Sequence, residues 1–121
     1  MAQILAIDDS VSIRKLVSFT LNHEGHEVLL AEDGQAGLDV LQNETPDLII
    51  TDIHMPIMNG IEFIKGAREL PDHRFTPILV LTTESGSDMK TQGKNAGATG
   101  WIVKPFTPER FVELVERVLN R

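Results

Sequence analysis

The sequence contains no cysteine among its 121 residues. This excludes both a disulfide framework and a thiolate metal site, and it suits a reducing cellular compartment. No apolar run approaches the ~20 residues of a membrane-spanning helix. The N-terminus, MAQILAIDDS, also lacks the basic start and long apolar core of a secretory signal peptide. We therefore expect a soluble, cytoplasmic protein that does not contact membranes.

Positive charge is scarce as well. The chain has 11 Lys and Arg against 18 Asp and Glu, which gives a formal net charge of −7. This excludes the basic surface that binding to a nucleic-acid backbone requires, and an acidic surface favours a monomer. The length and the 41% hydrophobic content predict a single domain over residues 1–121.

Short aliphatic runs alternate with segments of helical periodicity. The predicted strands cover residues 3–8, 27–31, 47–51, 77–81 and 100–103. DLII and PILVL are almost continuously aliphatic, which is typical of strands covered on both faces. Five strand–helix alternations with right-handed crossovers predict an α/β fold: a five-stranded parallel sheet with helices on both faces.

Two helices follow from clear periodicity. The first has Ser10 as its N-cap and Gly25 beyond its end, and the last follows the pair Thr107–Pro108. Further helices are predicted at 34–43, 60–69 and 86–96. The third of these has Gly93 in its interior and an almost wholly polar surface, so we expect it to be loosely held.

Chemically active side chains follow four of the predicted strands. In doubly wound sheets, ligands gather at the carboxyl ends of the strands, so these side chains share one edge. They are Asp8 and Asp9 after the first strand, Asp52 after the third, Thr82 and Thr83 after the fourth, and Lys104 after the fifth.

Three carboxylates at one edge need positive charge nearby. Two carboxylates ~4 Å apart repel by ~4 kcal/mol at an effective dielectric of about 20. Oxygen ligands alone favour a hard divalent cation such as Mg²⁺. With that ion and Lys104 the charges sum to zero, and an aspartyl phosphate of charge roughly −1.5 to −2 could then be accommodated.

Each of these residues also has an ordinary structural interpretation when taken alone. Asp8 or Asp9 could be a helix-capping acid, and Asp52 could be a turn acid. Thr82 could simply end a strand, and Lys104 could be a solvated loop charge. Their joint position at the strand ends of one sheet favours a functional site.

The segments LAIDDS, DLIITDIHMPIMNG, PILVLTTES and GWIVKP resemble the receiver domain of two-component response regulators, essentially end to end. The segment TTESGSDMKTQGKNAGATGWIVKPF is similar to the stand-alone, CheY-like chemotaxis regulators of that family. The resemblance implies strand order 2-1-3-4-5, as in the flavodoxin-like fold. It also implies a phosphorylation-activated signalling switch.

Site roles follow from the same resemblance. It implies that Asp52 accepts a phosphoryl group from a CheA-like histidine kinase. Asp8, Asp9, Asp52 and the backbone carbonyl of His54 would hold Mg²⁺, with Asp9 and Asp52 as the closer ligands. Lys104 would pair with the acceptor carboxylate or the phosphoryl oxygens, and Thr82 would move toward the phosphate. The Lys104–Pro105 peptide bond would be cis.

The resemblance also makes predictions for Trp101, His54 and Glu84. Trp101 stands where the family commonly has a tyrosine or phenylalanine rotamer switch; alternatively, it is a partly buried strand aromatic whose N–H finds a surface partner. His54 and Glu84 stand where the family tunes the phosphoryl lifetime. An imidazole ligand role for His54 is disfavoured because the site offers mainly oxygen. The remaining histidines, His23, His26 and His73, form no cluster and are expected on the surface.

The predicted function is a switch that is phosphorylated in a single turnover and dephosphorylates itself, rather than an enzyme. Its expected partners are the kinase and a downstream target such as a flagellar switch or another motility component. Three alternatives stay open: a receiver excised from a longer regulator, a Mg²⁺-dependent phosphohydrolase with an aspartyl nucleophile, and a receiver that only binds protein. The segment DIHMP lacks the second acid that such hydrolases typically use.

Overall fold

The computed structural model describes residues 1–120 and contains one parallel sheet with strand order β2-β1-β3-β4-β5. The strands are β1 (Gln3–Ile7), β2 (Glu27–Ala31), β3 (Leu48–Thr51), β4 (Ile78–Thr82) and β5 (Gly100–Val103). This confirms the predicted fold class and strand order. Arg121, the last residue of the predicted domain, lies outside the described residues.

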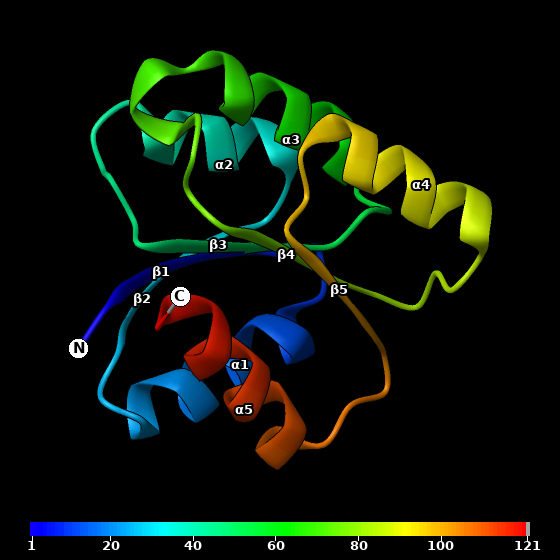
Figure 1. The fold of residues 1–121 in the computed structure, drawn as a ribbon. Coiled ribbons are helices and arrows are strands. Elements are labelled where there is room, and N and C mark those ends of the chain that lie inside the picture. The colour runs from blue at the N-terminus through cyan, green and yellow to red at the C-terminus, as the bar shows by residue number, and fades with distance from the viewer. Residues whose placement is uncertain (121) are drawn as a thin grey trace.

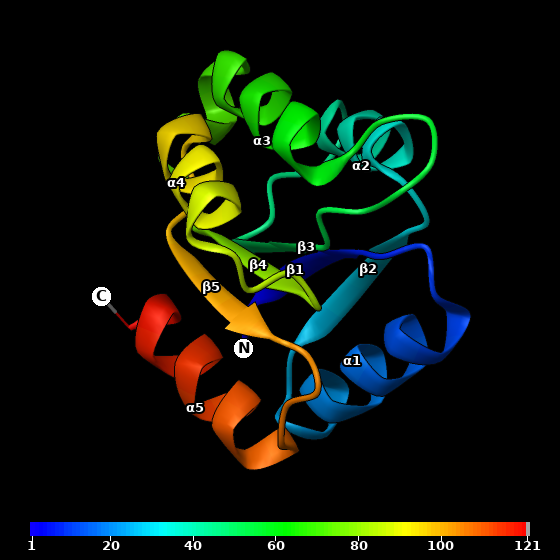
Figure 2. The same ribbon diagram turned by 90° about the vertical axis from the view of Figure 1, so that its right-hand side faces the viewer.

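The helices form two layers around the sheet. They are α1 (Val11–His23), α2 (Gly34–Leu41), α3 (Gly60–Glu69), α4 (Ser87–Ala96) and α5 (Pro108–Leu119), with a short 3₁₀ helix at Pro71–His73. Figure 1 shows α2, α3 and α4 on one side of the sheet and α1 and α5 on the other. Figure 2 shows the same layers from the side.

The alternation of side chains along each strand builds two hydrophobic cores. In β1, Ile4 and Ala6 join the core under α1 and α5, whereas Leu5 and Ile7 join the core under α2 and α3. All four side chains are buried. Continuous aliphatic strands are required because both faces of the sheet are covered.

Side-chain caps fix where four helices begin, among them α2, where the Asp33 carboxylate accepts from the Ala36 N–H. The Ser10 hydroxyl accepts from the Ile13 N–H at 3.2 Å, and Thr107 caps α5 in the same way, as predicted. At α3, Asn59 and Glu62 form a reciprocal capping box. Each cap satisfies backbone N–H groups that would otherwise lack a partner.

The expectation that the isolated histidines lie on the surface is wrong for two of the three. His23 is exposed, but His26 and His73 are buried. His26 Nδ1 accepts from the Ala2 N–H at 3.1 Å, and its Nε2 lies 2.8 Å from Glu116 Oε1. His73 Nε2 lies 3.3 Å from the Leu41 carbonyl. Partners from distant elements contact both ring nitrogens of His26 but only Nε2 of His73, because His73 Nδ1 is buried without a hydrogen-bond partner among residues 1–120.

The remaining differences concern element ends. The helix predicted at 34–43 ends at Leu41, the strands differ from the prediction by one residue or less, and the 3₁₀ helix was not predicted. Among residues 1–120, no helix has both the length and the apolar character needed to cross a membrane. The Lys104–Pro105 peptide bond is cis, as the resemblance implies.

Candidate functional site

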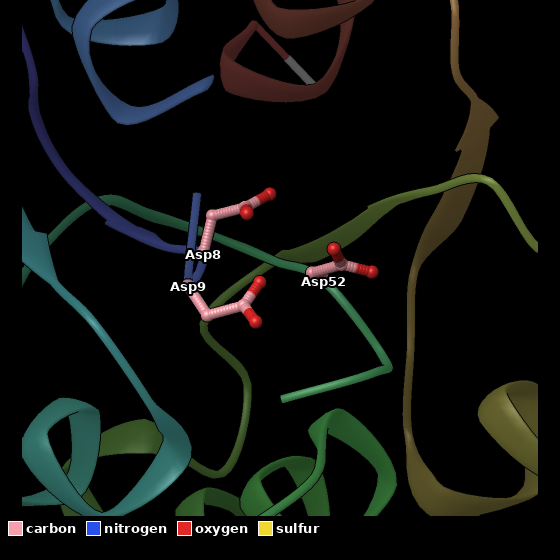
Figure 3. Close-up of side chains that lie close together, drawn as sticks. All are labelled: Asp8, Asp9 and Asp52. Atoms are coloured by element: carbon pink, nitrogen blue, oxygen red, sulfur yellow. The ribbon is translucent and has the colours of Figure 1, made fainter. Parts of the chain in front are cut away.

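Three carboxylates meet at the carboxyl edge of the sheet. In the register of the central strands, Ile7 of β1 lies beside Thr51 of β3. Asp8 follows Ile7 and Asp52 follows Thr51, so Asp8 and Asp52 are neighbours in space. Asp9 follows Asp8 in the chain. One carboxylate oxygen from each of the three lies within 4.8 Å of the others. Figure 3 shows the three side chains gathered at the ends of these strands.

Lys104 supplies the positive charge inside this cluster. It follows β5, and its backbone N–H donates to the Thr82 carbonyl at 2.7 Å. Its ammonium donates to Asp8 Oδ2 at 2.8 Å and to Asp52 Oδ2 at 3.0 Å. Three carboxylates and one ammonium leave two formal negative charges, which one divalent cation would neutralise.

Burial and charge act against each other on Asp8 and Lys104. Burial raises the pKa of Asp8 by more than the hydrogen bonds from Lys104 and the Ser10 N–H lower it. Burial also lowers the pKa of Lys104, but the bonds to Asp8 and Asp52 outweigh it and leave that pKa raised. Lys104 is therefore cationic at neutral pH, while the Asp8 carboxylate carries a desolvation cost that a further cation would offset.

Asp52 is held in place by backbone groups. It is only 8% exposed, and its Oδ1 accepts from the Ile53 N–H at 2.6 Å. The loop after it turns back at Gly60, whose N–H donates to the Ile53 carbonyl at 2.8 Å. A side chain at Gly60 would collide with the Asp52 carbonyl, so the tight loop requires glycine here. The position of Asp52 is thus fixed by the end of β3 and the start of α3.

Asp8 and Asp9 differ in burial and in hydrogen bonding. Asp8 is buried, and its Oδ1 accepts from the Ser10 N–H at 2.9 Å. The Arg14 guanidinium donates to the Asp8 carbonyl at 2.6 Å. Asp9 is exposed. A buried, oriented acid beside an exposed one leaves an open side through which a hydrated ion can enter, and the all-oxygen donor set fits Mg²⁺.

The imidazole of His54 contacts Glu84. Its Nε2 lies 3.1 Å from Glu84 Oε2, and this pair joins the loop after β3 to the loop after β4. His54 itself is exposed. The two residues expected to tune the phosphoryl lifetime are therefore in contact with each other, which the sequence alone did not indicate.

Glu84 also links Thr82 to Trp101 through its backbone. The Glu84 N–H donates to Thr82 Oγ1 at 3.3 Å, and the Trp101 indole N–H donates to the Glu84 carbonyl at 2.9 Å. Thr82 is fully buried at the end of β4. Within residues 1–120 its hydroxyl has no hydrogen bond to the three carboxylates. Trp101 is half-buried with a partner for its N–H, and its role as a switch stays a prediction.

Two further structural features were not predicted. The Arg68 guanidinium donates to the carbonyls of His73, Thr76 and Gly97, at 2.8, 2.6 and 2.7 Å, and so ties α3 to the chain on both sides of α4 and β4. No local pattern marks this long-range contact. The capping box at Asn59 did have a local signal, because Asn followed three residues later by Glu is typical of a helix start.

Comparisons with known proteins agree with this geometry. Residues 4–116 match the family model described as response regulator receiver domain. A chemotaxis protein CheY homolog of Campylobacter jejuni is 40% identical over 98% of this chain and 92% of its own length. The response regulator ArlR of Staphylococcus aureus is 35% identical over the whole of this chain, which covers 54% of that protein.

Among solved structures, the chemotaxis response regulator CheY4 of Vibrio cholerae superposes with a TM-score of 0.93 at 50% identity, with 98% of each chain covered. A putative response regulator of Chloroflexus aurantiacus superposes with the same TM-score at 31% identity, covering 99% of this chain and 98% of its own. The chain belongs to the response regulator receiver domain family. Within that family it is homologous to the CheY chemotaxis regulators.

Proposed function

We propose that this protein is a cytoplasmic switch of a two-component system that is phosphorylated on Asp52 by a histidine kinase in a Mg²⁺-dependent reaction. The observation that carries the proposal is the arrangement of Asp8, Asp9 and Asp52 around Lys104, with two formal negative charges left unbalanced. Membership of the receiver domain family supports a phosphorylation switch, and the names of the CheY relatives support a role in chemotaxis or motility.

The transfer exchanges one bond to phosphorus for another. A carboxylate oxygen of Asp52 attacks the phosphorus of a phosphohistidine, the P–N bond breaks, and an acyl phosphate forms. The imidazole nitrogen keeps the electron pair and takes a proton from solvent. Phosphoryl transfer depends mainly on positioning and charge stabilisation, and the backbone contacts of Asp52 provide the positioning.

Lys104 and the metal would share the charge stabilisation. Lys104 already lies 3.0 Å from Asp52 Oδ2, so its ammonium can follow the developing charge onto a phosphoryl oxygen. The carboxylates of Asp8, Asp9 and Asp52 and the carbonyl of His54 would hold Mg²⁺. When bound, this ion supplies the positive charge that lets an anionic phosphoryl group approach an acidic cluster.

The output would pass through Thr82. If its hydroxyl donates to a phosphoryl oxygen, the loop that carries Glu84 is drawn toward the site, because the Glu84 N–H is bonded to that hydroxyl. The Glu84 carbonyl would carry the change to Trp101, and thereby to β5 and α4. This remodels the partner-binding face. The His54–Glu84 contact lies across the same two loops and would set how long the phosphoryl group lasts.

The reaction would be a single turnover on the protein itself, followed by its own dephosphorylation. The inferred partners are a CheA-like kinase and a downstream motility protein such as a component of the flagellar switch. The alternative of a receiver that belongs to a longer regulator rests on the similarity to ArlR, of which this chain covers 54%. The higher identity to the CheY homolog, 40% against 35% for ArlR, favours the CheY-like role.

Intact-mass spectrometry tests the proposal. Incubation with Mg²⁺ and acetyl phosphate is expected to add one phosphoryl group that hydroxylamine removes, since an acyl phosphate is labile to that nucleophile. The variant Asp52→Asn should stay unmodified, and Asp72→Asn, a change at an exposed aspartate, should behave like the wild type. Wild-type protein that stays unmodified with this donor and with every histidine kinase of its own genome would refute the proposal.

A further inference from the structure

Ile57 has a backbone conformation that isoleucine rarely adopts. Its φ is 71°, and within residues 1–120 no other residue besides glycine has a positive φ. The N–H of Met58 donates to the Pro56 carbonyl at 2.7 Å, which closes a three-residue turn centred on Ile57. Such a turn with positive φ is rare and strained, and a β-branched residue makes it more so.

Burial of the Ile57 side chain does not compensate for this backbone strain. Ile57 is 82% exposed. The loop is held instead by its neighbours, because the Gly34 N–H donates to the Met58 carbonyl at 3.2 Å and the Gly60 N–H donates to the Ile53 carbonyl at 2.8 Å. Glycine or asparagine would fit the turn better and would expose no large apolar group. A strained, exposed isoleucine on a fixed loop indicates a contact with another molecule.

The position of the loop indicates which molecule. The loop begins directly after Asp52 and ends where Gly60 packs against the Asp52 carbonyl, so the turn is fixed relative to the carboxylates. In Figure 2 this segment, between β3 and α3, passes close to α2. Val11, which is 55% exposed, begins α1 two residues after Asp9. Exposed aliphatic side chains therefore lie on both chain segments that leave the cluster.

A protein that delivers a phosphohistidine to Asp52 comes up against these segments, because Asp52 is only 8% exposed and the two segments leave the cluster beside it. We propose that Ile57 is a docking contact for the histidine-phosphorylated donor, and that its side chain packs into an apolar patch beside the donor's phosphohistidine. This rests on the proposed function, since it assumes transfer to Asp52. A small-molecule donor has no such patch, so the contact selects a protein donor over a small one.

The test compares two phosphoryl donors on the same variants. One donor is acetyl phosphate, and the other is an autophosphorylated histidine kinase first shown to phosphorylate the wild-type chain. With the kinase, Ile57→Ala is expected to raise KM about tenfold with little change in kcat, the size of effect typical of one apolar anchor. With acetyl phosphate its rate should stay within about twofold of the wild type. Ile57→Leu keeps an apolar side chain and should retain most of the kinase rate.

Phe75→Ala is the matched control. Phe75 is 90% exposed and lies before β4, in a groove with Met1 and Thr99 at the amino-terminal edge of the sheet. Its loss should therefore leave the rate of phosphorylation by either donor unchanged. Equal losses with both donors for Ile57→Ala, or no loss with the kinase, would overturn the docking role. If neither acetyl phosphate nor any histidine kinase of the same genome phosphorylates the wild-type chain, the proposed function itself is refuted.

A stability measurement tests the strain separately. Ile57→Gly is expected to raise Tm by about 4 °C, because glycine adopts positive φ without steric cost. The same variant should lose kinase affinity as Ile57→Ala does. A lower Tm for Ile57→Gly would show that the isoleucine contributes to the fold itself, and this would overturn the inference.

Discussion

Asp8 is the residue on which burial and charge conflict most directly. Its carboxylate is buried beside two other acids, and it has one ammonium and one backbone N–H as partners. Burial raises its pKa despite those partners. In the metal-free protein, ionised Asp8 therefore costs the folded state stability at neutral pH, and this cost is what a bound cation would remove.

The variant Asp8→Asn tests this cost. In the presence of EDTA at pH 7, it is expected to raise the free energy of unfolding by about 1 kcal/mol, because a buried carboxylate charge is replaced by a neutral amide. Since the folded-state pKa lies above the ordinary value of 3.8, the wild type is penalised only once the pH exceeds that value. The difference between variant and wild type should therefore shrink as the pH is lowered toward 4.

Urea unfolding at pH 4 and pH 7 measures both differences, with Asp72→Asn as the control for loss of an exposed carboxylate. A variant less stable than the wild type at pH 7 would contradict the charge argument. So would a stability gap that is the same at both pH values.

At the scale of elements, α4 depends on its contact with β5. Gly93 is the buried residue of α4, and the helix has no side-chain cap at its start. A Cβ at Gly93 would lie 2.6 Å from Trp101 Cζ3, so glycine makes room for the indole. The polar helix expected to be loosely held is thus packed at Gly93 against the tryptophan that bonds to Glu84, and Met89 and Ala96 pack against the same core.

Gly93→Ala separates helix propensity from packing. Alanine favours an α-helix over glycine by about 1 kcal/mol, but overpacking against the indole is expected to give a net destabilisation of about 1–2 kcal/mol. In the background of Trp101→Ala the same change should become stabilising by about 0.5–1 kcal/mol. Urea unfolding of the four proteins of this double-mutant cycle measures the coupling. Equal effects of Gly93→Ala in both backgrounds would show that the indole does not occupy this space.

The element pattern was largely predictable from sequence, because periodicity and capping are local. The strands and the caps at Ser10 and Thr107 follow from these local patterns. The meeting of Asp8 with Asp52 follows from the strand order that the family resemblance implies. The contacts of His26 with Glu116 and of Trp101 with Glu84 were not predictable, since they join elements far apart in the chain. The positive φ of Ile57 was not predictable either, because isoleucine carries no signal for that conformation.

At the scale of the whole molecule, the net charge of −7 and the unbalanced acidic cluster link folding to the cation. A ligand that binds only the folded state stabilises it in proportion to the logarithm of its concentration. Mg²⁺ contributes in this way only if the three carboxylates hold it in the folded protein, because unfolding separates Asp52 from Asp8 and Asp9.

Mg²⁺ is therefore expected to stabilise the wild type by about 2.7 kcal/mol when free Mg²⁺ is 100 times its dissociation constant. Urea unfolding at increasing Mg²⁺, with ionic strength held constant by NaCl, measures this. Asp9→Asn should lose most of the effect, whereas Asp72→Asn should keep it. Equal stabilisation of all three proteins would indicate general screening of the acidic surface rather than a site.

The most direct measurement is a crystal structure of the protein with Mg²⁺ and beryllofluoride, which imitates a phosphoryl group on a carboxylate. We predict the ion bonded to carboxylate oxygens of Asp9 and Asp52, beryllofluoride on Asp52, and the Lys104 ammonium in contact with a fluoride. A structure in which the side chains of residues 8, 9 and 52 point apart, with neither ion nor beryllofluoride between them, would contradict this.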